Sequence, residues 1–175
     1  MEPTECALIV AVPEAERAVG RFRSALDIAA SWGVPAHVTV LYPFLPPDRI
    51  NEDVLATLSQ IFEATPRFDI SFAEVKWFGD NVVWLSPQPD GGLRQLTAAV
   101  WLRFPEAPPY AGAHADAVPH LTIGHDVPKH VLAQAAEAVA GHLPIRATVE
   151  AVRLIAGAPE PDSWHTLREF RLGSA

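Results

Sequence analysis

Pro35-Ala36-His37-Val38-Thr39-Val40 recurs in the second half of the chain as Val118-Pro119-His120-Leu121-Thr122-Ile123. Both copies read histidine, apolar, threonine, apolar, and both follow a proline. Successive side chains of a β-strand point to opposite faces of the sheet. The histidine and the threonine of each copy therefore share one face, while the apolar residues pack behind the strand. Two such strands facing each other would form a site with two imidazoles and two hydroxyls.

The bulk composition is that of a folded globular protein. Of 175 residues, 49% are hydrophobic and 19% are charged, which suits one domain with a sizeable core. No apolar run reaches the ~18 residues of a membrane span, and the acidic N-terminal segment lacks the basic start of a signal peptide. Cys6 is the only cysteine, so an intrachain disulfide and a thiolate metal cluster are excluded. We expect a cytoplasmic protein that does not associate with membranes.

The net charge restricts the possible partners. A formal charge of −8 argues against a protein that coats long nucleic acid by neutralising its phosphates. An acidic protein can still act on one phosphodiester or on a strand end, because a few local groups suffice there. We expect a monomer whose partner is a nucleotide or a small RNA end.

Hydrophobic periodicity, turn residues and caps predict an α+β order of elements. A helix capped by Asn51 or Asp48 is expected after the first motif, and an irregular segment, 105–119, leads into the second. The expected strands are 6–12, 37–42, 68–75, 82–86, 120–123, 145–155 and 163–172, and the expected helices are 13–30, 51–62, 93–104 and 128–140.

The element order contains an internal repetition. A motif strand followed by a helix and a hairpin occurs twice, and the two motifs lie about half a chain apart. This pattern predicts a duplication: residues 1–175 would form a single domain made of two pseudo-symmetric α+β lobes.

The paired motifs in a chain of this size resemble the 2H phosphoesterase superfamily, in particular its bacterial 2′-5′ RNA ligase-like and cyclic phosphodiesterase branch. In that branch the first motif continues into an aromatic-proline segment, here Leu41-Tyr42-Pro43-Phe44. The resemblance implies a bilobal duplicated fold in which two mainly antiparallel sheets face each other across a central cleft, with helices outside. It also implies catalysis by His37 and His120, phosphate binding by Thr39 and Thr122, and no metal or other cofactor.

The chain departs from the family at one position. Many members carry an arginine two residues after the second motif, where this sequence has His125 after Gly124. On an uninterrupted strand His125 would face away from His120, although the glycine could reorient it. We therefore expect His125 to replace the phosphate-binding arginine only if the strand is irregular there.

The chemistry of phosphodiester cleavage suits the four motif residues. The reaction needs a base for the attacking oxygen and an acid for the leaving oxygen, and a histidine with a pKa near about 6.5 can serve as either. Threonine hydroxyls can donate to the non-bridging oxygens. Which histidine is the base stays open, with His120 favoured as the base for water.

Further candidate residues lie near the motifs or late in the chain. Tyr42, Phe44, Trp84 and Trp164 could stack on a base, with Trp164 the one most expected to be partly open. Tyr110 could contact substrate together with His114. Arg153 is the preferred cationic phosphate contact. A metal site of His114, Asp116, His120 and His125 is disfavoured, because its spacing matches no zinc pattern. The histidines expected on the surface are His130, His142 and His165.

The favoured function is a metal-independent phosphoesterase that opens 2′,3′-cyclic phosphates or cleaves 2′-5′ bonds. One alternative is 2′-5′ ligation of tRNA halves, which the acidic composition disfavours. The other is a nucleotide-binding module without turnover, which the two intact motifs disfavour.

Overall fold

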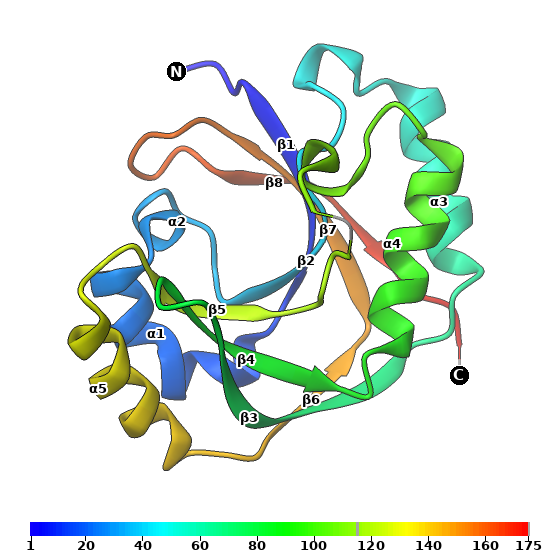
Figure 1. Ribbon diagram of the computed structural model, residues 1–175. Helices are drawn as coiled ribbons and strands as arrows, with labels where there is room; N and C mark the ends of the chain where they lie inside the picture. The colour runs from blue at the N-terminus through cyan, green and yellow to red at the C-terminus, as the bar shows by residue number, and fades with distance from the viewer. Residues whose placement is uncertain (115, 175) are drawn as a thin grey trace.

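Two antiparallel four-stranded sheets form the centre of the structure (Figure 1), a computed structural model that describes residues 1–114 and 116–174. The strand order is β2-β1-β7-β8 in the first sheet and β5-β4-β3-β6 in the second. The α+β class and the antiparallel sheets expected from the sequence are confirmed. The strands are β1 Glu5–Ala11, β2 His37–Leu41, β3 Phe68–Phe78, β4 Val82–Gln88, β5 Leu121–His125, β6 Ile145–Val149, β7 Ala151–Gly157 and β8 His165–Arg171.

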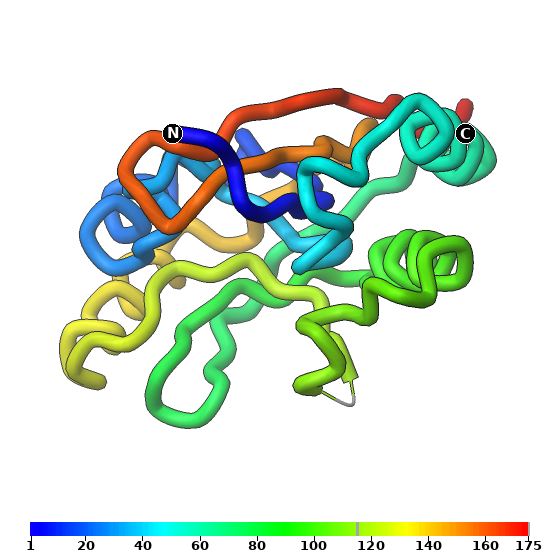
Figure 2. Tube along the Cα trace, turned by 90° about the horizontal axis from the view of Figure 1, so that it is seen from above, coloured from blue at the N-terminus to red at the C-terminus, as the bar shows by residue number. Residues whose placement is uncertain are grey.

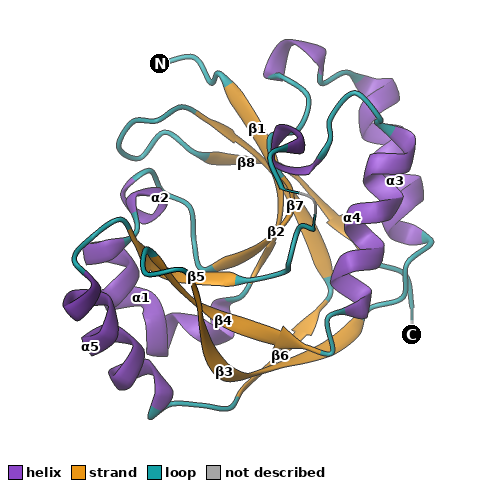
Figure 3. Ribbon diagram, in the orientation of Figure 1, coloured by secondary structure: helices purple, strands orange, loops and turns teal. Residues whose placement is uncertain are grey.

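The helices lie at the periphery, with α1 and α5 on one side of the sheets and α3 and α4 on the other (Figure 3). Asn51 caps α3 as predicted, because its side chain accepts a hydrogen bond of 3.0 Å from the Val54 amide. Within the described ranges no helix is long and apolar enough to cross a bilayer. The helices are α1 Glu16–Leu26, α2 Ile28–Ser31, α3 Glu52–Glu63, α4 Gly91–Arg103 and α5 Lys129–Ala140, with 3₁₀ turns η1 Pro13–Ala15, η2 Pro47–Arg49 and η3 Pro109–Gly112.

Strand β1 pairs on both edges, with β2 and with β7, and its side chains from residue 6 to residue 10 are buried. Its continuous apolar sequence suits a strand covered on both faces. The apolar residues of both motifs lie in the core as expected: Val38, Leu121 and Ile123 are fully buried. The motif strands therefore sit on a rigid, packed base.

Each sheet combines strands from both halves of the chain. The sheet of β2 contains the late hairpin β7–β8, and the sheet of β5 contains the earlier hairpin β3–β4. The motif strands β2 and β5 are edge strands of the two sheets, and they lie next to each other (Figure 1). The lobes expected from the sequence are thus interleaved, and the duplication itself stays a prediction.

The single helix expected over 13–30 is wrong. Asp27 has an extended backbone, with φ −123° and ψ 110°, and it divides the segment into α1 and α2. Its side chain accepts a hydrogen bond of 3.1 Å from the Ala29 amide and so begins the second helix. The apolar spacing was right, but it could not reveal that a buried carboxylate interrupts the helix.

The single strand expected over 145–155 is also wrong. The segment forms β6 and β7, which belong to different sheets and are separated by Glu150. Alternation of apolar and polar residues continues through such a crossing, so the pattern cannot distinguish one strand from two. This crossing connects the two sheets.

Candidate active site

Each motif strand contains a register slip directly after its threonine. The pairing of β2 with β1 slips by one residue beyond Thr39, and the pairing of β5 with β4 slips by one residue beyond Thr122. An extra residue in one strand reverses the side-chain alternation beyond it. His125 therefore lies on the same face as Thr122, and both line one cavity with His120. The sequence left open whether the chain at Gly124 reorients His125. In the structure the strand is irregular there, and His125 faces the same side as Thr122.

The two catalytic candidates make the same backbone contact. The His37 Nδ1 atom lies 2.8 Å from the Pro35 carbonyl oxygen, and the His120 Nδ1 atom lies 2.8 Å from the Val118 carbonyl oxygen. A carbonyl only accepts, so Nδ1 carries the hydrogen in each ring and Nε2 holds the lone pair. The described residues provide no hydrogen-bond partner for either Nε2. Both rings are thus oriented for proton transfer at Nε2.

Tyr110 connects the two halves of the site. It lines the cavity of His120 and Thr122, and its hydroxyl lies close enough to Thr39 for that side chain to lower the Tyr110 pKa, although burial raises it more. The Tyr110 amide donates a 2.6 Å hydrogen bond to the Tyr42 carbonyl. His37 and Thr39 line a second cavity, together with Tyr42. Tyr110 therefore links the cavity of His120 and Thr122 to Thr39 in the cavity of His37.

Both histidines titrate below their ordinary range. Burial and the charge of Arg23 lower the pKa of His37 to about 4, against opposing effects of the Pro35 carbonyl and Asp27. Burial also lowers the pKa of His120, and the charge of His114 adds to this. The charge of His120 acts on His37 as well, which reflects their proximity. At neutral pH both rings are therefore uncharged in the free protein.

A buried charge network, Arg23–Asp27–His125, supports this site. The Arg23 Nε donates to Asp27 at 3.1 Å, and its Nη2 donates to the Val34 carbonyl at 3.1 Å. The His125 Nε2 lies 3.3 Å from Asp27, and its Nδ1 lies 2.8 Å from the exposed Asp126. The sequence reasoning missed Arg23 and Asp27. One signal was available: Arg23 and Asp27 follow the apolar Val19 by four and eight residues, so helical spacing predicts that they share its face.

His125 is a cation at neutral pH. Asp27, and after it Asp126, raises the pKa of His125 to about 9, although burial opposes this. Because the pKa of this histidine is higher in the folded state than its unfolded-state value of about 6.5, its protonation contributes full stabilisation below that value. The stabilisation is lost as the pH rises through the folded-state pKa. We expect the free energy of unfolding to fall by about 3 kcal/mol between pH 6.5 and 9.5.

Urea denaturation at a series of pH values measures this loss. The His125→Gln variant should show a flatter dependence over the same range, while His142→Gln, at an exposed position, should match the parent protein. An unchanged slope in His125→Gln would contradict the assignment of the effect to this ring.

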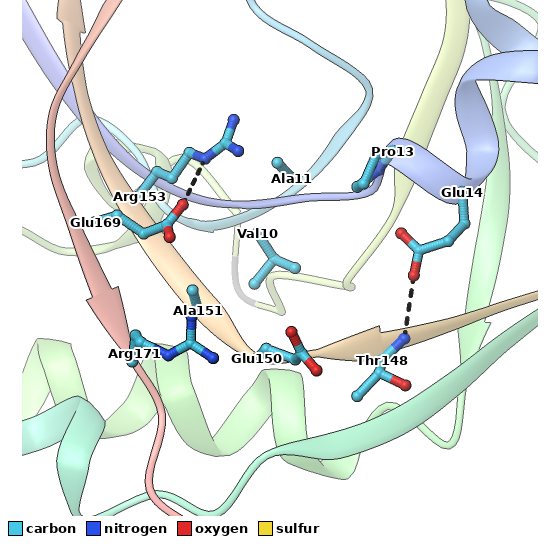
Figure 4. A pocket seen from close by; sticks show the side chains of 10 residues that line it. All are labelled: Val10, Ala11, Pro13, Glu14, Thr148, Glu150, Ala151, Arg153, Glu169 and Arg171. Atoms are coloured by element: carbon cyan, nitrogen blue, oxygen red, sulfur yellow. Dashed lines mark hydrogen bonds and ion pairs between the residues drawn. The ribbon is translucent and has the colours of Figure 1, made fainter.

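Arg153 lies apart from the cavities of the two histidines. It lines a third cavity of about 410 Å³, where its Nε pairs with Glu169 at 3.1 Å (Figure 4). Glu14 and Glu150 also line this cavity, so its charge is mixed. Arg153 therefore lines neither of the two histidine cavities.

Trp164 lines the cavity of His37 and Thr39, which has a volume of about 160 Å³. The expectation that its side chain is partly open is wrong, because it is only 7% exposed. Its ring packs so tightly over Gly157 that a Cβ there would lie 2.4 Å from it. The missing side chain at Gly157 is thus what allows the indole to be buried.

Phe78 is a lining residue of the His120 cavity that the sequence reasoning missed. It ends β3, where the expected strand stopped at residue 75, and it stacks on Trp84 of β4. His114 is exposed and contacts the Tyr110 ring edge-on, with 5.5 Å between centroids. The remaining histidines, His130, His142 and His165, are exposed as predicted.

The site offers acid–base groups and hydrogen-bond donors rather than a set of metal ligands. Among the described residues, no three side chains of His, Cys, Asp or Glu come together as a possible metal-binding group. The arrangement can transfer protons at two Nε2 atoms and can donate from two hydroxyls.

Solved structures with the same fold include two bacterial proteins and a phosphoesterase. TT0787 of Thermus thermophilus has 18% identity and a TM-score of 0.66, with 97% of this chain and 98% of that chain covered. E. coli LigT complexed with 3′-AMP has 18% identity and a TM-score of 0.60, covering 99% and 100%. The phosphoesterase has 17% identity and a TM-score of 0.61, with the same coverage as LigT.

No curated protein sequence matches the chain significantly. A family model does match it, over residues 11–158, and that model describes the 2′-5′ RNA ligase superfamily. The match includes both motifs and most of the elements that carry the site. The chain therefore belongs to the 2′-5′ RNA ligase superfamily.

Proposed function

We propose that the protein is a metal-independent phosphoesterase that hydrolyses 2′,3′-cyclic phosphates or 2′-5′ phosphodiester bonds at small RNA ends or in nucleotides. The observation that carries this proposal is the shared geometry of His37 and His120. Each ring is held by one backbone carbonyl at Nδ1 and has its Nε2 available. Such a pair suits in-line displacement at phosphorus, which needs a base on one side and an acid on the other.

The roles of the two histidines differ because their surroundings differ. Buried Arg23 disfavours a proton on His37, whereas the described neighbours that affect His120 include no buried arginine or lysine. We therefore assign His37 as the base and His120 as the acid, the reverse of the assignment favoured from the sequence. His37 Nε2 takes a proton from the attacking water, and His120 Nε2 gives a proton to the leaving ribose oxygen.

The other lining residues would bind the substrate. Thr39 and Thr122 would donate to the non-bridging oxygens, whose charge they stabilise in the transition state. His125 would supply the fixed positive charge that an arginine supplies in many family members. We propose substrate contacts for Tyr110 on the His120 side and for two residues on the His37 side, Tyr42 and Trp164. The solved complexes of LigT with 3′-AMP and with ATP support a small nucleotide as ligand.

Assays of the purified protein in EDTA test the reaction. With 2′,3′-cyclic nucleotides and 2′-5′ dinucleotides as substrates, turnover in the chelator is expected. Turnover that requires added metal would contradict the mechanism. Binding without turnover would instead favour a nucleotide-binding module, and joining of RNA ends without hydrolysis would favour a ligase.

The pH profile provides a second test. The free enzyme is active when His37 is neutral and His120 is protonated, and kcat/KM reports the free enzyme. Because both pKa values are lowered, that of His37 to about 4, kcat/KM should be highest at acidic pH, below about 6.5. Steady-state kinetics from pH 3.5 to 9 measure it, and an optimum above pH 7.5 would contradict the lowered pKa values.

A further inference from the structure

The cavity beside His120 has the size and the walls of a nucleobase site. Its volume is about 490 Å³, within the ~300–1,000 Å³ typical of small-molecule sites. The cavity on the His37 side, at about 160 Å³, is below that range. By volume, a nucleoside therefore fits on the His120 side better than on the His37 side.

One wall of the larger cavity is a preformed aromatic stack. The rings of Phe78 and Trp84 lie 4.5 Å apart with an interplanar angle of 27°, and His120 meets Phe78 edge-on at 5.1 Å. Trp84 is 4% exposed and Phe78 is 38% exposed. Trp84 thus covers one face of the Phe78 ring, and the opposite face is available to a second planar group.

Another part of the cavity lining comes from the loop before the second motif. The tip of the β3–β4 hairpin and the turn η3 project on the same side of the molecule (Figure 2). Tyr110 and His114, which contact each other edge-on, line the cavity from this loop, together with the aliphatic Val118. The apolar and aromatic part of this lining suits a flat heterocycle, while Thr122 and His125, which line the same cavity, would contact the phosphate.

We propose that Phe78 is the stacking platform for the nucleobase of the substrate, on the His120 side of the phosphate. This inference rests on the proposed function, which determines on which side of the phosphorus the ribose oxygen leaves. With the nucleoside beside His120, the P–O bond to the ribose breaks and the ribose oxygen takes its proton from His120. The new P–O bond forms to water, whose proton goes to His37. Stacking accepts any base, so the site selects a nucleoside rather than one particular nucleotide.

Ligand binding at fixed pH tests the platform with two probes, adenosine 2′-monophosphate and inorganic phosphate. Loss of a base stack weakens binding of the nucleotide by about 10- to 100-fold. We expect this for Phe78→Ala and for Phe78→Leu, which keeps an apolar side chain without a ring, while both variants retain the affinity for phosphate. Phe78→Trp should bind the nucleotide within about threefold of the parent protein.

The control is Trp101→Ala, which removes an aromatic side chain that is 46% exposed on α4, and it should bind both probes as the parent does. Unchanged nucleotide affinity in Phe78→Leu would overturn the proposal, and so would an equal loss of nucleotide and phosphate binding. If the nucleotide binds in a Phe78-dependent manner but no substrate is turned over, the nucleobase site stands and the proposed function fails.

Discussion

Replacing His37 or His120 with alanine should lower kcat about 10²- to 10⁴-fold, the usual contribution of a general acid or base. Each ring is the only proton-transfer group on its side of the phosphorus in the proposed mechanism. Because the two act in one step, the double variant should be only slightly slower than either single variant. Initial rates with a 2′,3′-cyclic nucleotide at saturating concentration measure the effect.

The control for this prediction is His142→Ala, since His142 is exposed outside the site. It should keep the kcat of the parent protein. The assigned roles have their own signature: without His37, the residual activity should no longer fall at acidic pH. A kcat within threefold of the parent in either single variant would contradict the two-histidine mechanism.

Removing the carboxylate of Asp27 should produce the largest loss of stability. Asp27 and Arg23 are 6% and 3% exposed, so Asp27→Ala leaves the Arg23 guanidinium buried without its partner. Breaking a buried pair in this way costs about 3–5 kcal/mol. His125 loses its buried partner at the same time. Urea or thermal unfolding at pH 7 measures the difference in the free energy of unfolding.

A second ion pair, at the start of α4, provides the control for this prediction. Asp90 and Arg94 form an ion pair of the same residue types at the same spacing but in reverse order, with 27% and 40% of their side chains exposed, and Arg94 also pairs with Asp116. Asp90→Ala should cost no more than about 1 kcal/mol, because partly exposed pairs are screened by water. Replacing both buried partners, as Arg23→Met with Asp27→Leu, should cost less than Asp27→Ala alone. A loss below about 1 kcal/mol in Asp27→Ala would show that the network is not essential for folding.

The network also links stability to the proposed chemistry. Arg23 lowers the pKa of His37, and Asp27 raises the pKa of His125. The buried Arg23–Asp27 pair in the first half of the chain thus affects the pKa of His37 and the pKa of His125, which lies in the second half. The proposed role of His125 as a fixed positive charge requires such a partner, since an isolated histidine is mostly neutral at pH 7.

Much of the site could be predicted from short stretches of sequence. The shared face of His37 and Thr39 follows from strand alternation, and the burial of Val38 confirms it. The cap at Asn51 and the β3–β4 turn are also set by neighbouring residues. These features were predictable because each depends on interactions within a few residues. The single helix over 13–30 was wrong because Asp27, which interrupts it, is paired with a residue far along the chain. The single strand over 145–155 was wrong because the segment passes from one sheet to the other.

The sequence by itself determined which four side chains form the motif faces and that apolar residues hold each face in place. Only the tertiary structure decided that His125 joins them. The slip in β5 turns its ring into the cavity, and α1 lies so close that a Cβ at Gly124 would be 2.7 Å from that of Leu26. The physical reason is distance along the chain: alternation and capping act between neighbours, whereas this approach and the Arg23–Asp27–His125 network join segments about a hundred residues apart.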